Sequence, residues 1–299
     1  MKTIVVIGSA NTDMVVKSDK LPLPGETLLG GTFFMNPGGK GANQAVAAAR
    51  LGGSVTLVTK VGNDIFGRQT AEDLAKENIN TDYVFVDNVA PSGTALIMVN
   101  QDGENCIVVA PGANGNLLPR DIENIPAINE AEIVVVQLEI PMQTIASVIE
   151  KAKANGQKVI LNPAPAQLLS DELLNGLFLI TPNETEAQLL TGVKVRDLES
   201  ASKAAGRLLR KGVQNVIITL GKQGAYLQNE SQRLLIGAPI VEAVDTTAAG
   251  DTFNGGIAVA VAEGMGWDEA IPFACRAASI SVTRLGAQAS IPYRKEVLA

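Results

Sequence analysis

The sequence of 299 residues contains no histidine, and its aromatic side chains make up only 4% of the chain. Without histidine, a proton acceptor in any enzymatic site has to be another side chain. The scarcity of aromatic residues is unlike a platform on which carbohydrate rings or single-stranded nucleic-acid bases stack. Glycine and alanine are abundant instead, which favours the close packing of helices on a sheet.

Basic charge is also in short supply. The chain has 24 lysines and arginines against 31 acidic residues, which gives a formal net charge of −7. Because the phosphate backbone of a nucleic acid requires a basic face, we expect no nucleic-acid partner. Backbone N–H groups and a metal ion can still bind an anion on an acidic protein, so the charge does not argue against nucleotides.

Cysteines and long apolar runs are rare as well. The two cysteines, Cys106 and Cys275, lie far apart without CxxC spacing, which indicates neither a disulfide framework nor a zinc site. No apolar stretch reaches the length of a membrane span, and the run at 3–8 is too short for a signal peptide. Since 46% of the residues are hydrophobic, the chain can build a sizeable core. We expect a cytoplasmic protein with no membrane partner.

Short β-branched runs alternate with helical patterns over most of the chain. Continuous apolar runs of this kind are typical of strands buried on both faces, and the alternation favours a parallel sheet. The pattern therefore predicts an α/β fold with a doubly wound, mostly parallel sheet and helices on both faces. Predicted strands cover 3–8, 55–62, 132–139, 158–162, 177–181 and 215–221, and predicted helices cover 41–51, 66–77, 141–155, 183–191 and 199–211.

Two segments break this rhythm. Residues 13–36 and 93–109 contain shorter, alternating strands around turn signals such as Asp102-Gly103. They predict a small β-sheet outside the main sheet. With no internal repeat or linker in sight, we predict one domain over residues 1–299, with these two segments as insertions.

Polar residues follow several of the predicted strands. Ligands of doubly wound sheets bind beyond the carboxyl ends of the strands, so these residues are candidates for a site. They are Asn11, Asp13, Glu139, Asn162 and Asn183.

The stretch "NPGGKGANQAVAAARLG" at 36–52 is rich in glycine before an apparent helix. Gly38, Gly39 and Gly41 would let the backbone approach a ligand closely, and Asn43 falls in the first helical turn. It is not a Walker loop, because Gly41 follows the lysine where serine or threonine is required. A tight turn that leads into a packing helix explains the same residues equally well.

Two shorter stretches each allow two interpretations. In "TPNETE" at 181–186, carboxylates and an amide suit Mg²⁺ held through waters, while Asn183 and Glu186 also fit a capping box, and both roles are compatible. In "TLGKQGA" at 219–225, Gly221 and Gly224 flank a turn between two strands. That turn is a candidate wall for a nucleotide, although the local pattern favours a simple hairpin.

The stretch "DTTAAGDTFNGG" at 245–256 precedes an apolar helix. Ala248, Ala249 and Gly250 would present consecutive backbone N–H groups at the helix start, which is an anion site. Asp251 in the first turn is stabilised as a carboxylate by the helix dipole. Because a helix cap alone does not require Asp245 and three threonines as well, the stretch indicates a functional role.

The stretches "GGKGANQA" at 38–45 and "DTTAAGDTFNGG" resemble the two signatures of the phosphofructokinase-B-type, or ribokinase-like, sugar kinases. The shorter motifs "GSANTD", "QLE", "NPAP", "PNETE", "TLGKQG" and "VTRLGAQASIP" follow the same order. They extend the resemblance from Gly8 to Pro292, nearly the whole chain.

The resemblance implies ATP-dependent phosphorylation of D-ribose at the 5-hydroxyl, which yields D-ribose 5-phosphate and ADP. The substrate could instead be 2-deoxyribose, another pentose or hexose, or a nucleoside. A non-catalytic sugar-sensing module on the same fold is an alternative from another class. The presence of Asp251 argues against it, since a sensor has no need for a base.

The resemblance also implies a role for individual residues. Asp251 would be the general base, and Ala248, Ala249 and Gly250 the anion hole. The sugar would contact Asn11, Thr12, Asp13, Gly39, Lys40, Gly41, Ala42, Asn43, Glu139 and Asp251. ATP would contact Asn183, Thr219, Leu220, Gly221, Lys222, Gln223, Gly224, Gly250, Asp251 and Cys275.

Two metal ions and a second subunit belong to the same expectation. A monovalent cation, typically K⁺, would bind at Asp245, Thr247, Ser281, Arg284, Gly286 and Ser290, and Mg²⁺ near Glu186 through water. The small sheet would be a lid that closes over the sugar and pairs with the lid of a second subunit in a homodimer. One departure concerns Cys275, whose position more often carries histidine or asparagine in the family.

Overall fold

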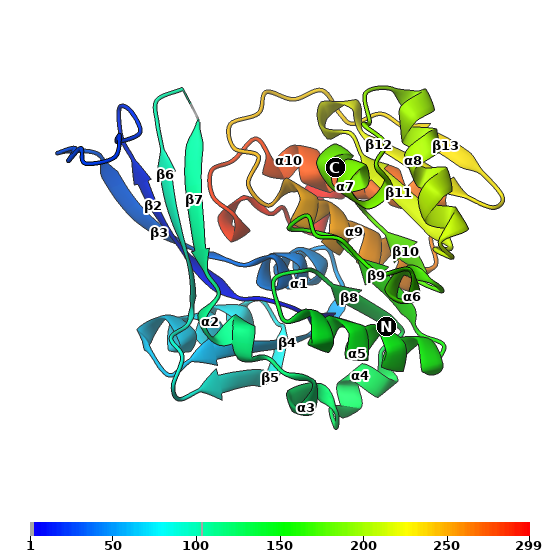
Figure 1. Ribbon diagram of the computed structural model, residues 1–299, viewed down its shortest axis with the longest axis horizontal. Helices are drawn as coiled ribbons and strands as arrows, with labels where there is room; N and C mark the ends of the chain where they lie inside the picture. The colour runs from blue at the N-terminus through cyan, green and yellow to red at the C-terminus, as the bar shows by residue number, and fades with distance from the viewer. Residues whose placement is uncertain (1–2, 103) are drawn as a thin grey trace.

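The structure is a computed structural model that describes residues 3–102 and 104–299 (Figure 1). The chain begins in the middle of a nine-stranded sheet of order β13-β12-β11-β10-β9-β8-β1-β4-β5. In it, β1 (Thr3–Ile7) lies parallel between β4 (Ser54–Gly62) and β8 (Ile133–Val136). The predicted α/β class with a mostly parallel sheet is confirmed.

The six predicted strands all form, most of them over slightly shorter spans. The other parallel strands are β5 (Asn80–Asp87), β9 (Lys158–Leu161), β10 (Leu179–Ile180) and β11 (Asn215–Thr219). At one edge, β12 (Ala225–Asn229) and β13 (Arg233–Ile236) run antiparallel. The edge strands β5 and β13 were not predicted, because their half-exposed residues lack the continuous apolar run that marks the central strands.

The predicted helices are confirmed as α1 (Lys40–Arg50), α2 (Ile65–Lys76), α5 (Met142–Ala154), α7 (Glu184–Thr191) and α8 (Leu198–Arg210). The apolar helix after residue 250 is α9 (Ala249–Glu263), followed by α10 (Trp267–Ser281) and α11 (Arg294–Leu298). Short helices α3 (Pro119–Ile122), α4 (Pro126–Glu130) and α6 (Asp171–Leu174) complete the set among the described residues. None of these helices combines the length and apolar character that crossing a membrane requires.

Alternate residues of β1 show why helices cover both faces of the sheet. Ile4 and Val6 pack into the core that α1, α9 and α10 form on one face. Val5 and Ile7 point the other way, into the core under α5 and α8. Because successive side chains of a strand point to opposite faces, a continuous apolar strand requires cover on both.

A second, four-stranded sheet stands apart from the first, on the left in Figure 1. Its order is β3 (Thr32–Gly38), β2 (Asn11–Lys17), β6 (Gly93–Val99) and β7 (Asn105–Ala110). The prediction of a small sheet from 13–36 and 93–109 is confirmed, although its first strand begins at Asn11 and 18–31 contains no strand. Gly103 of the predicted turn lies outside the described residues.

Candidate active site

The strand order predicts a crevice at the carboxyl ends of β1 and β8. From β1 the chain proceeds to β4 and β5 on one side, then returns to β8 on the other side of β1. At such a switch point the loops after the two strands diverge and leave room for a ligand. Ser9, just after β1, donates a hydrogen bond from Oγ to Oε2 of Glu139, which follows β8. The same Glu139 oxygen accepts the backbone N–H of Lys40 at 3.0 Å, so α1 begins at this crevice.

The glycines around the start of α1 are needed because other parts of the chain pack closely against them. A Cβ on Gly41 would lie 2.6 Å from backbone atoms of Gly8 and Ser9, and one on Gly38 would lie 2.3 Å from Oδ2 of Asp13. Gly39 has a φ of 87°, in the left-handed region that favours glycine. The tight-turn interpretation therefore holds. The contact of this loop with a ligand stays a prediction, but its packing brings the N-terminus of α1 against the end of β1.

The carboxylate of Asp251 is held at the N-terminus of α9. The residue is only 5% exposed. Its Oδ2 accepts a hydrogen bond from Nδ2 of Asn43 at 2.9 Å, and its Oδ1 accepts one from Nε2 of Gln44 at 3.0 Å. The Oδ1 of Asn43 is buried and has no hydrogen-bond partner among the described residues, so this acceptor still lacks a donor.

The first turn of α9 has the form expected of an anion site. Ala248 precedes the helix with a φ of 59°, a left-handed conformation that alanine rarely adopts. A left-handed residue followed by helical ones can turn consecutive N–H groups toward one point. Of these groups, the N–H of Ala249 also donates to the carbonyl of Thr246, at 3.3 Å. A Cβ on Gly250 would meet no atom within 4 Å, so the space over this turn is open. The predicted residues Ala248, Ala249 and Gly250 are thus placed together beside Asp251.

The charges of four carboxylates act on one ammonium, that of Lys40. The pKa of Lys40 is raised, mainly by Asp251, with Glu139, Glu186 and Asp13 adding to the effect. The pKa of Asp13 is raised to about 6, first because the group is buried and then because Glu139 and Asp251 repel its charge. Burial likewise raises the pKa of Glu186. Negative charge therefore dominates the site, and a polyanionic substrate needs a cation to enter it.

The residues predicted to lie along a nucleotide follow β10 and β11. Asn183 caps α7 and forms the predicted capping box with Glu186, and its backbone pairs with Thr219. The hairpin interpretation of 219–225 is confirmed, with a short helical turn between β11 and β12. The turn between the two strands contains Leu220, Gly221, Lys222, Gln223 and Gly224. A Cβ on Gly221 would meet nothing within 4 Å, which leaves this surface open.

Cys275 lies in the middle of α10 and is 5% exposed. It belongs to the apolar core between α9, α10 and the sheet. Burial raises the pKa of its thiol to about 11, so the side chain stays a neutral thiol at physiological pH. A contact of Cys275 with a nucleotide stays a prediction.

The residues predicted to bind a monovalent cation come from two segments that Asp245 joins. Its Oδ1 accepts the N–H of Thr247 and its Oδ2 the N–H of Gly286, both at 2.9 Å. Ser281 and Ser290 lie close to these segments in the sequence. Both are buried, and each donates a hydrogen bond from its hydroxyl to a backbone carbonyl. The side chain of Arg284 forms an ion pair with Glu296, so the backbone carbonyl of Arg284 is the group that could reach a cation.

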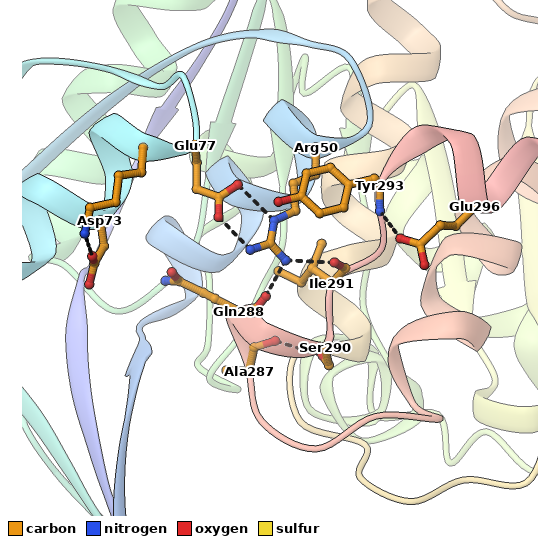
Figure 2. A network of polar contacts seen from close by, with 10 residues as sticks. Arg50, Asp73, Glu77, Ala287, Gln288, Ser290, Ile291, Tyr293 and Glu296 are labelled. Atoms are coloured by element: carbon orange, nitrogen blue, oxygen red, sulfur yellow. Dashed lines mark hydrogen bonds and ion pairs between the residues drawn. The ribbon is translucent and has the colours of Figure 1, made fainter.

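The C-terminal segment is anchored by Arg50, the last residue of α1 (Figure 2). Its guanidinium binds both carboxylate oxygens of Glu77, at 2.9 and 2.6 Å, and donates to the carbonyls of Gln288 and Ile291 at 2.7 and 2.8 Å. The ring of Tyr293 lies 5.0 Å from the guanidinium carbon. Because these carbonyls flank Ser290, Arg50 fixes the segment that would hold the cation.

Several residues of the site were missed from the sequence. Asn114, in the 3₁₀ turn Gly112–Asn116, accepts the N–H of Ala10 at 2.9 Å and donates to Oδ1 of Asn11 at 2.7 Å, which fixes the amide of Asn11. Nothing in the sequence links positions so far apart. Gln44 and Gln137 lie inside the motifs "GGKGANQA" and "QLE". Their functional role was not predicted, because a neutral amide has no charge or motif spacing that would indicate one.

Comparison with known proteins agrees with this geometry. The family model for pfkB family carbohydrate kinases matches residues 1–294. A ribokinase of Haemophilus influenzae is 47% identical over 298 residues, which cover 99% of this chain and 97% of that protein. A deoxyribokinase of Salmonella typhi is 40% identical over 291 residues, 97% of this chain and 95% of its own. The structure of an Arabidopsis thaliana ribokinase complexed with ribose and ATP superposes with a TM-score of 0.93 at 37% identity, covering 99% of this chain and 97% of the other.

A match over nearly the whole chain, together with a buried carboxylate at the N-terminus of α9, assigns both fold and chemistry. The chain belongs to the pfkB family of carbohydrate kinases and is an ATP-dependent sugar kinase.

Proposed function

We propose that this kinase phosphorylates D-ribose at the 5-hydroxyl, with Asp251 as the general base. The observation that carries the proposal is the buried carboxylate of Asp251, aligned by two amides at the mouth of a helix N-terminus. Phosphoryl transfer requires positioning and charge stabilisation more than covalent help from the protein, so a carboxylate suffices to accept the hydroxyl proton. The ribokinase names of the relatives support ribose as the acceptor.

The sugar would lie between β2, the glycine loop and Asp251. Asn11, Thr12 and Asp13 face it from β2, Gly39 through Asn43 from the loop, and Glu139 from the end of β8. A ribose hydroxyl is the donor that the unpaired Oδ1 of Asn43 needs. Carboxylates and amides together can accept and donate in pairs to neighbouring hydroxyls.

ATP would lie along Asn183 and the turn from Thr219 to Gly224, with its transferred phosphoryl group at the first turn of α9. There the N–H groups of Ala248, Ala249 and Gly250 stabilise the charge that develops in the transition state. They take the part that a P-loop lysine plays in other kinases. The small sheet would exclude water when it closes over the sugar.

Magnesium fits this site when it is held through waters and phosphate oxygens. No group of three or more potential metal-ligating side chains forms among the described residues, so the protein builds no direct cage. The buried carboxylate of Glu186 accepts from Asn183 and keeps further lone pairs for water ligands. Bound Mg²⁺ would neutralise phosphate charge that this acidic crevice otherwise repels.

The substrate assignment is tested by ADP release with D-ribose, 2-deoxyribose, fructose and adenosine. We expect the highest kcat/KM with D-ribose. A higher value with 2-deoxyribose would place the chain with the deoxyribokinases, which are 40% identical to it. Turnover of none of the four would contradict a kinase of this substrate class.

Sugar affinity should depend on the ionisation of Asp13. Its pKa is raised to about 6, so its carboxylate predominates only above that pH. Below it the protonated group loses an acceptor for sugar hydroxyls, and the dissociation constant of D-ribose without ATP should rise roughly fourfold from pH 7 to pH 5.5. Calorimetric titration at each pH measures this. The Asp13→Asn variant should bind D-ribose more weakly, and its dissociation constant should no longer depend on pH in this range. If the pH dependence stayed the same in the variant, another group would be responsible for it.

We further propose that a monovalent cation, K⁺ in preference to Na⁺, binds where Asp245 joins the 245–247 and 284–290 segments. Arg50 holds this segment in place through the carbonyls of Gln288 and Ile291, and the carbonyls of Arg284, Gly286 and Ser290 between or before them would supply oxygen ligands to the cation. We expect kcat to rise several-fold when K⁺ replaces a large organic cation in the buffer, because the ordered segment abuts the anion hole. The response should be lost in Asp245→Ala; equal rates in both buffers would remove the site.

The small sheet supports a proposal on assembly. One face of its strands exposes five large apolar side chains, namely Phe33, Met35, Leu96, Met98 and Val108, while Phe34, Ile107 and Val109 are exposed on the opposite face. A patch of this kind marks an interaction surface. We propose that the chain is one catalytic domain with this sheet as a lid, and that the lid of a second copy covers the patch in a homodimer.

A further inference from the structure

A line of buried side-chain amides leads from Asp251 into the large sheet. Nε2 of Gln44 donates to Oδ1 of Asp251 and to Oδ1 of Asn162, each at 3.0 Å. Oε1 of Gln44 accepts from Nε2 of Gln137 at 2.7 Å. Gln44 and Gln137 are both 0% exposed, so water does not compete for these bonds.

The direction of every bond in this line is fixed by its first member. A carboxylate only accepts, so Gln44 has to present its NH₂ group to Asp251 and its carbonyl to Gln137. Gln137 therefore has to present its own NH₂ group. Its Oε1 lies against Gly8, where a Cβ would come within 2.1 Å, so the absence of a side chain at position 8 makes room for this amide.

We propose that Gln44 is a positioning residue for the general base and that Gln137 acts through it. The inference rests on the proposed role of Asp251. With Asn43 on one oxygen and Gln44 on the other, the carboxylate is held in one orientation, and both donors stabilise its ionised form. The bond from Gln137 occupies Oε1 of Gln44 and adds a second restraint on this amide, whose NH₂ group the carboxylate already directs toward itself.

Other ionisable groups also face Asp251. They are Lys40 from α1, Asp13 from β2 and Glu186 from α7. All three remain when an amide of the line is replaced. A difference in pH profile between a variant and the parent protein therefore reports the lost hydrogen bond.

The first test is Gln44→Met, which keeps the volume and removes the amide. We expect kcat to fall about 10- to 100-fold, while KM for the sugar changes less than about threefold, since the side chain of Gln44 is fully buried. The acidic limb of the kcat profile should move up by about one pH unit, because a donor to the charged form is lost. A lower kcat with an unmoved acidic limb would overturn the proposal.

The second test is Gln137→Met, which touches neither Asp251 nor substrate and carries the test if Gln44→Met does not fold. It should move the limb in the same direction by a smaller amount. The double variant should be no slower than Gln44→Met within about twofold, because Gln137 acts through Gln44. Additive losses would contradict that path.

A matched control is Thr59→Val. Thr59 is 0% exposed on β4, and its hydroxyl has no partner among the described residues, so the change also removes a buried polar atom. It should leave kcat and the acidic limb unchanged. Asp251→Asn, assayed alongside, separates the two hypotheses: if it stays active the base assignment fails, whereas if it is inactive and Gln44→Met is normal only the positioning role fails.

Discussion

Asp251→Asn is expected to lower kcat about 10²- to 10⁴-fold, the usual scale for the loss of a positioned base. An amide of the same shape cannot accept the hydroxyl proton, and it presents a donor to Asn43 or Gln44, which are themselves donors. Sugar KM should change far less, because most of the proposed sugar contacts come from β2 and the glycine loop. Steady-state ADP release measures kcat and KM, and a thermal melt checks that the variant is folded.

The control for this variant lies on the same helix. Glu263, near the C-terminus of α9, pairs with Arg294 at the protein surface. Glu263→Gln removes a carboxylate from α9 without touching the crevice, and it should leave kcat unchanged. A kcat within about tenfold of the parent in Asp251→Asn would contradict the assignment of the base.

Gly41→Ala is expected to disrupt both stability and sugar binding. The added Cβ would lie 2.6 Å from backbone atoms of Gly8 and Ser9, and backbone cannot turn aside as a flexible side chain can. Overpacking of this kind costs up to about 3 kcal/mol of the free energy of unfolding. For a chain of this size we expect Tm to fall by about 6–12 °C.

The same substitution should raise sugar KM by about 10²-fold, because a displaced α1 carries Lys40 and Asn43 away from the crevice. The control is Gly237→Ala, at a position where a Cβ meets nothing within 4 Å and φ is not left-handed. It should change neither Tm nor KM. If Gly41→Ala melted within about 2 °C of the parent, the contact between α1 and β1 would not be as tight as the structure has it.

The periodicity of the chain was enough to predict the central strands and most long helices. Buried parallel strands such as β1 and β8 are continuously apolar, and their signal is strong. The edge strand β5 and the short helices α3, α4 and α6 gave no such signal, since half-exposed or very short elements impose little pattern. The rule that polar residues after strands gather at one edge identified Asn11, Glu139 and Asn183 as candidates.

In the glycine loop, the structure shows a reason for the glycines that the sequence pattern did not reveal. Gly38, Gly39 and Gly41 were identified as positions of close approach, but the nearest atoms are those of the chain itself. A sequence shows that a Cβ is missing, without showing what would occupy its space. The same limit applies to Asn114, whose partners at Ala10 and Asn11 are about a hundred residues away.

By itself, the sequence determined the fold class, the family signatures and the identity of the acidic residue at the start of α9. These are local properties, written in periodicity and in short motifs. Only the tertiary structure decided which donors hold that residue: Asn43 and Gln44 of α1 meet Asp251 of α9 more than 200 residues later, and Gln137, just after β8, donates to Gln44 in turn. The physical reason is that a neutral amide acquires a role only through its partner, and the partner is chosen by packing.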